Sequence, residues 1–206
     1  MRIGIISDIH GNVSGLEQAL EAMGQVDEIL CAGDLVYQYR FSNEVIEIVR
    51  SLGVKCVRGN HEDIIISHHG ANLRASGTIK PENLRYITNL PIRFEEQIDG
   101  KKFYMVHGSP WDPLREYVMP QDRRIEQMKE IDADVVVMGH THFPMVRKVG
   151  KVLVINPGSC GDPRDHSYGL RLTFAVLDTE TGEAEIRVIE EAEGPSTEGL
   201  ALFTGV

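Results

Sequence analysis

Short apolar runs alternate with amphipathic helical stretches along most of the chain, and this alternation restricts the fold more than any other feature. The runs typical of strands cover residues 3–6, 28–32, 54–57, 102–106, 135–138, 152–155, 172–177 and 185–189. Strands that alternate with helices form sheets covered by helices, whereas the last runs follow one another without a helix between them. The sequence therefore predicts an α/β layered sandwich with a strand-rich C-terminal part.

Capping residues mark where several of the predicted helices begin. Ser14 with Glu17 three residues later matches a capping box, Ser42 and Asp122 are further caps, and Pro81 suits the first turn of a short helix. The apolar residues after the first two caps fall on single helical faces, formed by Leu16, Ala19, Leu20 and Met23, and by Val45, Ile48, Val49 and Leu52. We therefore expect amphipathic helices that each pack one face on a sheet.

The composition is that of a soluble globular protein of one domain, with 206 residues, of which 42% are hydrophobic and 25% are charged. From residue 191 the chain becomes acidic and rich in Gly, Ser, Pro and Thr, so we predict one domain over residues 1–190 and a mobile acidic tail over 191–206. The net charge of −10 argues against binding to duplex nucleic acid or to an anionic membrane surface.

Two further features concern the cellular compartment. No apolar run is long enough for a membrane span, and the short run at the N-terminus does not match a signal peptide, so the sequence predicts a cytoplasmic protein. Cys31, Cys56 and Cys160 are widely spaced and form no Cys-x-x-Cys pair, which predicts reduced, buried thiols. The composition thus excludes classes of partner but does not identify a function.

Five of the predicted strands end in side chains that commonly bind metal ions. These side chains are Asp8 and His10, Asp34, Asn60 and His61, His107, and His140 and His142, and a glycine flanks nearly every group. Open α/β sheets bind ligands in the crevice outside the carboxyl ends of their strands, so we expect these side chains to converge. Each motif alone is typical of a turn, but five of them together predict a shared site.

The residue types in this group predict two metal ions rather than one. Counted without His61, the set offers two carboxylates, one amide oxygen and four imidazoles. This mixture of oxygen and nitrogen donors suits Mn, Fe, Zn, Ni or Co. Seven ligands are too many for one tetrahedral site, and they suit two ions that share a bridging carboxylate.

The order of these motifs resembles the calcineurin-like metallophosphoesterase superfamily. The matching blocks are Asp8-x-His10, Gly33-Asp34, Gly59-Asn60-His61-Glu62, His107 and Gly139-His140-Thr141-His142. The segment Asn156-Pro157-Gly158-Ser159, continued by Gly161-x-Pro163-Arg164-Asp165, is similar to the C-terminal signature of a branch of small bacterial and archaeal phosphodiesterases. The resemblance implies a four-layer α/β/β/α sandwich with a dinuclear metal site at the carboxyl ends of the strands.

The resemblance also implies a role for each site residue. One divalent ion would be held by Asp8, His10, Asp34 and His142, and the second by Asp34, Asn60, His107 and His140, so that Asp34 bridges the two. His61 would be the catalytic residue, which stabilises the phosphate in the transition state or protonates the leaving oxygen. Apart from the resemblance, we expect Asn60 and Arg164 to bind the substrate, although an ion pair of Arg164 with Asp162 or Asp165 is the alternative and is slightly favoured for an arginine at the surface. Manganese is the expected metal, with Fe, Ni, Zn or Co as alternatives.

The predicted activity is that of a metal-dependent phosphoric ester hydrolase. Our first interpretation is a phosphodiesterase that hydrolyses a small or nucleotide-like phosphodiester by in-line attack of a metal-bridging hydroxide. A phosphomonoesterase or protein phosphatase is the alternative, and a non-catalytic protein-interaction module on the same fold is an alternative of another class. The expected partner is a small phosphate-ester substrate, without duplex nucleic acid or membrane, and the formation of a homo-oligomer is left open.

One segment departs from the family patterns. Residues 33–40 lack the Asp-Arg pair in the Gly-Asp-x-Val-Asp-Arg-Gly block of the Ser/Thr protein phosphatases, which favours the phosphodiesterase interpretation. Tyr39-Arg40-Phe41 replaces the Tyr-Gly-Pro turn expected in the small branch, so the substrate preference of that branch does not carry over directly. Two further residues have two interpretations each. Glu62 either orients His61 or is an acidic residue in the first turn of a helix that interacts with the helix dipole. Trp111 either forms an aromatic wall of the site or is a packing residue.

Overall fold

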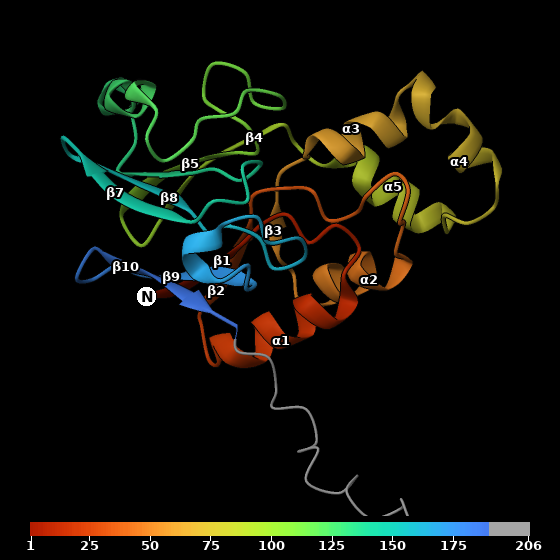
Figure 1. Cartoon of the computed structure of the whole chain (residues 1–206), viewed down its shortest axis with the longest axis horizontal. Helices are drawn as coiled ribbons and strands as arrows, with labels where there is room; N and C mark the ends of the chain where they lie inside the picture. The colour runs from red at the N-terminus through yellow and green to blue at the C-terminus, as the bar shows by residue number, and fades with distance from the viewer. Residues whose placement is uncertain (190–206) are drawn as a thin grey trace, which may run out of the picture.

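Three parallel strands form one side of the first of two sheets in the computed structural model, which describes residues 1–189 (Figure 1). They are β1 (Arg2–Ile6), β2 (Glu28–Cys31) and β3 (Lys55–Cys56). The antiparallel strands β9 (Thr173–Asp178) and β10 (Glu183–Val188) extend the sheet beyond β1, in the order β10-β9-β1-β2-β3. The first and last parts of the described chain therefore share one sheet.

The second sheet has a similar mixture of parallel and antiparallel strands. Its parallel centre is formed by β5 (Lys101–Val106), β6 (Val135–Val137) and β8 (Val152–Asn156). The antiparallel strands β4 (Arg93–Ile98) and β7 (Met145–Val149) are its edges, in the order β4-β5-β6-β8-β7. These two edge strands are the ones that the sequence did not predict.

The edge strands escape prediction because their buried side chains do not alternate. In β4 only Phe94 and Ile98 are buried, and in β7 only Met145 and Val149. In each strand the two buried residues are four apart and every residue between them is exposed. The alternation of buried and exposed residues that marks a half-buried strand is therefore missing. Edge strands tolerate such polar sequences because solvent reaches them and charged side chains there discourage pairing with other chains.

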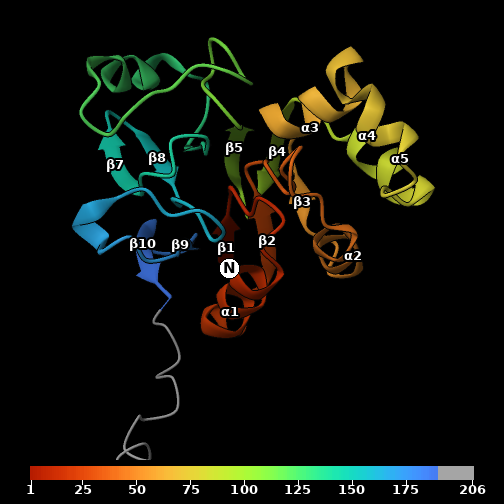
Figure 2. The ribbon, with the colours of Figure 1, turned by 45° about the vertical axis from the view of Figure 1, so that its right-hand side comes forward.

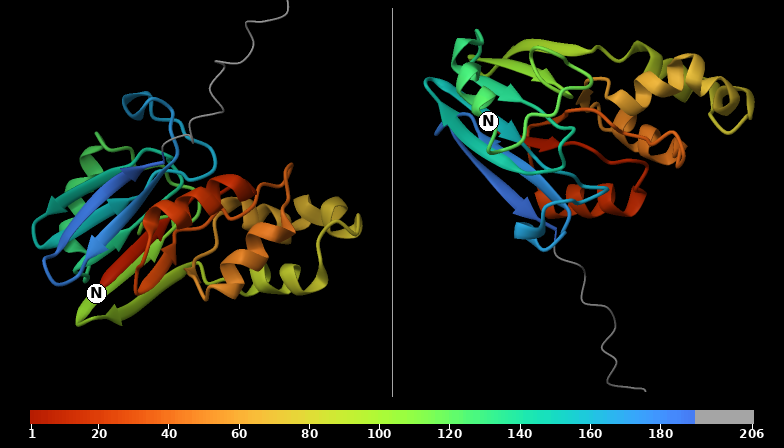
Figure 3. Two further views of the ribbon diagram at one scale, coloured as in Figure 1. Left: turned by 90° about the horizontal axis from the view of Figure 1, so that it is seen from below. Right: turned by 45° about the horizontal axis from the view of Figure 1, so that its top comes forward.

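The two sheets pack face to face, and helices cover both outer faces (Figures 2 and 3). The core between the sheets includes the fully buried Ile3 and Phe103. The first sheet is covered by α1 (Val13–Met23) and α2 (Asn43–Ser51), and the second by the 3-10 helix η2 (Arg123–Glu130). The predicted four-layer α/β/β/α sandwich is therefore confirmed, with a 3-10 helix in the fourth layer.

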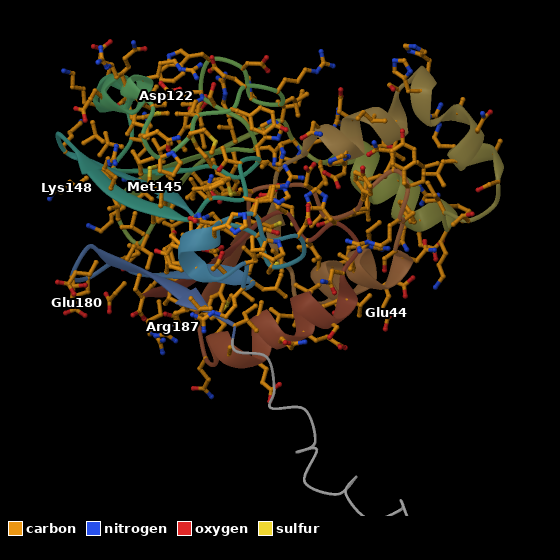
Figure 4. All side chains as sticks on the ribbon, in the orientation of Figure 1. Glu44, Asp122, Met145, Lys148, Glu180 and Arg187 are labelled. Carbon is orange, nitrogen blue, oxygen red and sulfur yellow. The ribbon has the colours of Figure 1, made fainter. Side chains whose placement is uncertain are left out.

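Strand β6 is apolar at every position because other layers cover both of its faces. Val135 and Val137 pack in the core between the sheets, whereas Val136 packs with Met128 of η2 on the other face. A strand covered on both faces is apolar at every position, as the sequence predicted. By contrast, the exposed Lys148 on β7 and the exposed Glu180 in the β9–β10 turn lie at the edge of the sandwich (Figure 4).

Several short helices complete the described chain. After β3 come α3 (Asn60–Ile66), η1 (His68–Gly70), α4 (Ala71–Ala75) and α5 (Pro81–Asn89), at the right of Figure 1, and η3 (His166–Tyr168) precedes β9. The start of α5 at Pro81 and the cap of α2 by Ser42 are confirmed. Leu52, which we expected on the packed face of α2, is 52% exposed because the helix ends at Ser51.

Other expectations have separate outcomes. The three cysteines are buried and unbonded, as predicted. Among the described residues, no helix combines the length and the apolar character that a membrane span requires. The cytoplasmic location, the oligomeric state and the domain boundary at residue 190 stay predictions, and the acidic tail at 191–206 lies outside the described residues.

The predicted capping box at Ser14 is wrong. Helix α1 begins at Val13 and its cap is Asn12, whose side chain accepts a hydrogen bond from Gly15 N at 3.0 Å and donates one to Gly161 O at 3.1 Å. Ser14 lies inside the first turn, where its hydroxyl accepts from a side chain one turn further on. Asparagine caps a helix as well as serine does, and here it also ties the helix to a distant loop.

We expect Asn12→Ala to lower the free energy of unfolding by about 1–2 kcal/mol, because the change removes both the cap and the bond to Gly161. Ser14→Ala is the matched control, with an expected change below about 0.5 kcal/mol. Urea unfolding followed by circular dichroism measures both changes. Equal losses in the two variants, or a larger loss in Ser14→Ala, would contradict the assigned cap.

Candidate metal centre

The side chains expected to converge lie together at one end of the sandwich, where strands of both sheets end. They are Asp8 and His10 after β1, Asp34 after β2, Asn60 and His61 after β3, His107 after β5, and His140 and His142 after β6. Main-chain bonds hold these loops: Asp8 N donates to Gly33 O at 3.0 Å, and His140 N donates to Asp8 Oδ2 at 3.0 Å. The second bond joins the two sheets through a residue of the site.

Three overlapping groups of described side chains could hold a metal ion, and one of them is formed by His10, Asp34 and His61. The other two correspond to the predicted ligand sets and are called the ligand groups below; Asp8, His10 and His142 form the first. The Nε2 atoms of His10 and His142 are 3.0 Å apart, and Asp8 Oδ1 lies 3.3 Å from His142 Nε2 and 3.7 Å from His10 Nε2. Asp34 Oδ2 lies 4.0 Å from His10 Nε2. The residues of the first predicted ligand set therefore lie together, and their role as ligands stays a prediction.

Asp34, Asn60, His107 and His140 form the second ligand group. His107 Nε2 lies 3.2 Å from Asp34 Oδ2, 2.9 Å from Asn60 Oδ1 and 3.0 Å from His140 Nδ1. Asp34 Oδ2 therefore faces nitrogen donors of both groups, which is the position expected of a bridging carboxylate oxygen.

The imidazoles of three predicted ligands are held from behind by backbone carbonyls. His107 Nδ1 bonds to Ala32 O at 2.8 Å, His140 Nε2 to Arg115 O at 3.2 Å, and His142 Nδ1 to Asp162 O. A carbonyl oxygen can only accept, so each of these outward nitrogens carries the proton. The inward nitrogen of each ring in its neutral form then offers a lone pair to the cluster, as in metal-bound histidines.

Backbone strain and unpaired polar atoms also concentrate in the cluster. Within residues 1–189, seven residues other than glycine have positive φ, and five of them are predicted ligands: Asp8, His10, Asp34, His140 and His142. Asp8 Oδ1 and His10 Nδ1 are buried without a hydrogen-bond partner. Such costs persist at functional sites, and a carboxylate oxygen that faces imidazole nitrogens without bonding to them fits a cation as its partner.

Opposing effects set the protonation of the buried carboxylates. Burial would raise the pKa of Asp8 and of Asp34, but the imidazoles of His142 and His107 outweigh burial and hold each pKa below its usual range. Burial would likewise lower the pKa of His107, but the Asp34 carboxylate raises it to about 9. Two ionised carboxylates thus remain in the buried cluster, and a divalent ion can replace the proton on His107.

The imidazoles of two further predicted ligands are neutral donors at neutral pH. Burial is the main effect that lowers the pKa of His10 and of His140 to about 4. A neutral imidazole is the form that binds metal ions. Carboxylates, an amide oxygen and neutral imidazoles on rigid loops therefore fit a pair of transition-metal ions.

Glu62 supports the Asp34 loop and not the His61 ring. Its fully buried carboxylate accepts hydrogen bonds from Gly59 N at 2.8 Å, Asp34 N at 3.1 Å and Val36 N at 3.0 Å. Burial and the nearby Asp34 charge raise the pKa of Glu62 to about 7. Glu62 thus joins the loops after β2 and β3 to each other.

Gln38, which the sequence analysis did not identify, holds His61. The side-chain oxygen of Gln38 bonds to His61 Nδ1, and Tyr37 packs edge to face on the same ring, with centroids 4.6 Å apart. The opposite nitrogen, His61 Nε2, lies 3.7 Å from Asp34 Oδ2. The only sequence signal for Gln38 is its position four residues after Asp34, in the segment that departs from the family patterns.

Two pockets adjoin the ligand groups, and neither contains Trp111, which is 44% exposed. The His10 pocket, of about 350 Å³, is lined by His10, Tyr37, Tyr39, Arg40, Asp162 and Arg164. The His140 pocket, of about 260 Å³, is lined by Asn60, Asp63, Ile64, Arg115, Tyr117 and His140. The aromatic side chains that line these pockets are tyrosines, and Trp111 forms a wall of neither. Arg164 lies in the first pocket, where it is also paired with Asp162 Oδ2 at 3.1 Å.

Comparison with known proteins identifies the family of the chain. The family model for the calcineurin-like phosphoesterase superfamily domain matches residues 1–182. Two proteins of Methanocaldococcus jannaschii are similar: an uncharacterized one is 30% identical over 91% of this chain and 87% of its own, and a phosphodiesterase is 29% identical over 92% and 100%. The crystal structure of a metallophosphoesterase from Sphaerobacter thermophilus superposes with a TM-score of 0.77 at 30% identity, over 93% of this chain and 90% of that one.

We expect Mn²⁺ to stabilise the folded protein, because the ligand groups exist only when the strands of both sheets are assembled. At about a hundredfold excess of Mn²⁺ over its Kd, the expected gain is about 2.7 kcal/mol, measured as a rise in the thermal unfolding midpoint. Asp34→Asn should abolish most of the rise. Glu180→Gln removes an exposed carboxylate elsewhere and should keep it, and an equal rise in both variants would rule out Asp34 as a shared ligand.

A side chain at position 59 should separate the two loops of the site. A Cβ on Gly59 would overlap the Asp34 carboxylate and its backbone nitrogen, so we expect Gly59→Ala to cost about 1–3 kcal/mol and to remove the stabilisation by Mn²⁺. Gly77→Ala is the control, because its φ of +76° brings backbone strain while the space around it is open. Thermal unfolding with and without Mn²⁺ compares them. Loss of the Mn²⁺ effect in Gly77→Ala as well would show that general destabilisation, not displacement of Asp34, is responsible.

Proposed function

The chain belongs to the calcineurin-like phosphoesterase superfamily, and we propose that it is a dinuclear, metal-dependent phosphodiesterase acting on a small or nucleotide-like phosphodiester. The observation that carries this proposal is the position of Asp34 Oδ2, which is 4.0 Å from His10 Nε2 and 3.2 Å from His107 Nε2. One carboxylate oxygen thus faces a nitrogen donor of each ligand group, as a ligand shared by two ions must.

The proposed ligand sets follow the two groups. Asp8, His10, Asp34 and His142 would hold one ion, Asp34, Asn60, His107 and His140 would hold the other, and Mn²⁺ is the proposed metal. When bound, the ions would lower the pKa of a water molecule and offset the charge of the phosphate. The chain itself fixes the donors through its loops of positive φ and through the carbonyl groups behind the imidazoles.

His61 is the proposed catalytic residue. Because Gln38 holds Nδ1, the other ring nitrogen faces the ligand groups, 3.7 Å from Asp34 Oδ2. The Gln38 oxygen accepts from Nδ1, so Nε2 carries a proton only when the ring is an imidazolium. In that form Nε2 can donate its proton to the leaving oxygen while the bond from that oxygen to phosphorus breaks. Burial lowers the pKa of His61, and the nearby Asp34 carboxylate opposes this effect by stabilising the charged ring. The edge-to-face contact with Tyr37 limits rotation of the ring and thereby keeps the donor aligned.

Asn60 and Arg164 are the proposed substrate-binding residues. Asn60 directs Oδ1 toward His107 Nε2 at 2.9 Å, so its amide nitrogen is left to donate to a phosphate oxygen. Arg164 lies in the His10 pocket and shares its guanidinium with Asp162. An arginine in a single ion pair retains donors for a phosphate oxygen of the substrate.

The two pockets support a diester in preference to a monoester. A phosphodiester carries two organic groups, and the His10 and His140 pockets each offer a space beside one ligand group. The similar phosphodiesterase of Methanocaldococcus jannaschii favours the same substrate class. A small ester remains the proposed partner, since the net charge of −10 opposes long polyanions.

Replacement of His61 tests the proposed mechanism. With Mn²⁺ present, we expect His61→Ala to lower turnover of a dinucleoside monophosphate by about 10²–10⁴-fold, because its alkoxide leaving group needs a proton. Bis(p-nitrophenyl) phosphate has a leaving group that departs without one, so its turnover should fall less. The p-nitrophenyl phosphate monoester should be a poorer substrate than the diester.

The control variant is His68→Ala, because His68 is exposed and lies outside both ligand groups. It should leave the turnover of both diesters unchanged. Unchanged turnover in His61→Ala, or equal losses on both leaving groups, would refute the role of His61 as proton donor. A preference for the monoester would refute the diesterase assignment.

A further inference from the structure

The segment that departs from the family patterns forms one wall of the His10 pocket. Tyr37 and Tyr39 pack edge to face with ring centroids 5.4 Å apart, and Arg40 Nε donates to His10 O at 3.0 Å. Tyr39 is 82% exposed, so its ring is available to a ligand. The departure therefore adjoins a predicted metal ligand and does not lie on a remote surface.

Charge distinguishes the two pockets. Arg40 and Arg164 both line the His10 pocket, but within the part of the chain that the structure describes only Arg164 has an ion-pair partner, Asp162. In the His140 pocket, Arg115 Nη2 lies 3.5 Å from Asp63 Oδ2 and is balanced by it. The side chains that line the His10 pocket thus include one arginine without an ion-pair partner among the described residues, whereas the arginine of the His140 pocket is neutralised.

Arg40 is held in an orientation suited to an anion. Its Nε bond to the His10 carbonyl ties the guanidinium to the backbone of the site and leaves both terminal nitrogens without an acidic partner among residues 1–189. A planar guanidinium with two free nitrogens can bind a phosphate or carboxylate through paired hydrogen bonds. In a chain with a net charge of −10, such a local positive charge selects for a negatively charged group.

We propose that the substrate carries a second negatively charged group, which Arg40 and Arg164 bind in the His10 pocket while the scissile phosphodiester lies over the ligand groups. A phosphate on the ribose of a nucleotide belongs to this class, and Tyr39 offers a ring face to the base. The charge-balanced His140 pocket takes an uncharged substituent of the diester. This inference rests on the proposed phosphodiesterase function and specifies its substrate class.

Two probes that differ by one phosphate test the inference on the full-length protein with Mn²⁺. They are thymidine 5′-(p-nitrophenyl phosphate) and the same compound with a phosphate on its 3′ oxygen. We expect the KM of the 3′-phosphorylated probe to be about tenfold lower, because that probe gains charge-assisted hydrogen bonds. Bis(p-nitrophenyl) phosphate, which carries no second anionic group, monitors the phosphodiesterase reaction itself.

Arginine variants assign the effect to the His10 pocket. Arg40→Gln and Arg164→Gln should each raise the KM of the 3′-phosphorylated probe and reduce the difference between the two probes. Arg40→Lys keeps the charge and should restore part of the difference. Arg147→Gln is the matched control, because it removes an exposed arginine of β7 that lines neither pocket, and the difference should persist.

Equal KM values for the two probes in the unmodified protein, with bis(p-nitrophenyl) phosphate still hydrolysed, would overturn the inference and leave the phosphodiesterase function standing. A difference that survives the combined Arg40→Gln and Arg164→Gln changes would also overturn it. If none of the three compounds is hydrolysed, the proposed function itself fails, and the inference fails with it.

Discussion

The Asp34 carboxylate is the interaction on which the rest of the site depends. Its Oδ1 accepts a hydrogen bond from His61 N at 2.9 Å, whereas its Oδ2 faces the imidazoles of both ligand groups. Glu62 holds the same loop by accepting from Asp34 N at 3.1 Å. Because its contacts reach the loops of both sheets, a shift of this one side chain would disturb both ligand groups and the proposed proton donor together.

The fold could be predicted wherever burial leaves a local pattern in the sequence. Strand β6 is buried on both faces and is apolar throughout, so it was recognised, whereas β4 and β7 bury two side chains each and resemble polar loops. The cap of α1 was missed for a different reason. Asn12 is fixed by a bond to Gly161, which is 149 residues away, and no local pattern encodes such a contact.

In the site, too, residues that belong to a sequence motif could be predicted, whereas residues that act through tertiary contacts could not. The seven predicted ligands meet because parallel strands of two adjoining sheets end at one place, which the motif order indicated, and their role as ligands stays a prediction. Gln38 and Arg40 were not identified, because their contacts depend on how the loop after β2 folds back over the cluster. The only signal in the sequence was that residues 33–40, which include this loop, depart from the family patterns.

The charge distribution is the reason that we propose a small, doubly anionic ester as the substrate of this acidic chain. Two divalent ions would reverse the local charge of the buried carboxylates, but salt screens such a field over roughly 8–10 Å. A second anionic group therefore needs its own countercharge, and Arg40 and Arg164 would supply it in the His10 pocket. A long polyanion would extend past both onto a surface of net charge −10. The proposed arrangement would therefore admit a compact nucleotide-like ester and oppose duplex nucleic acid.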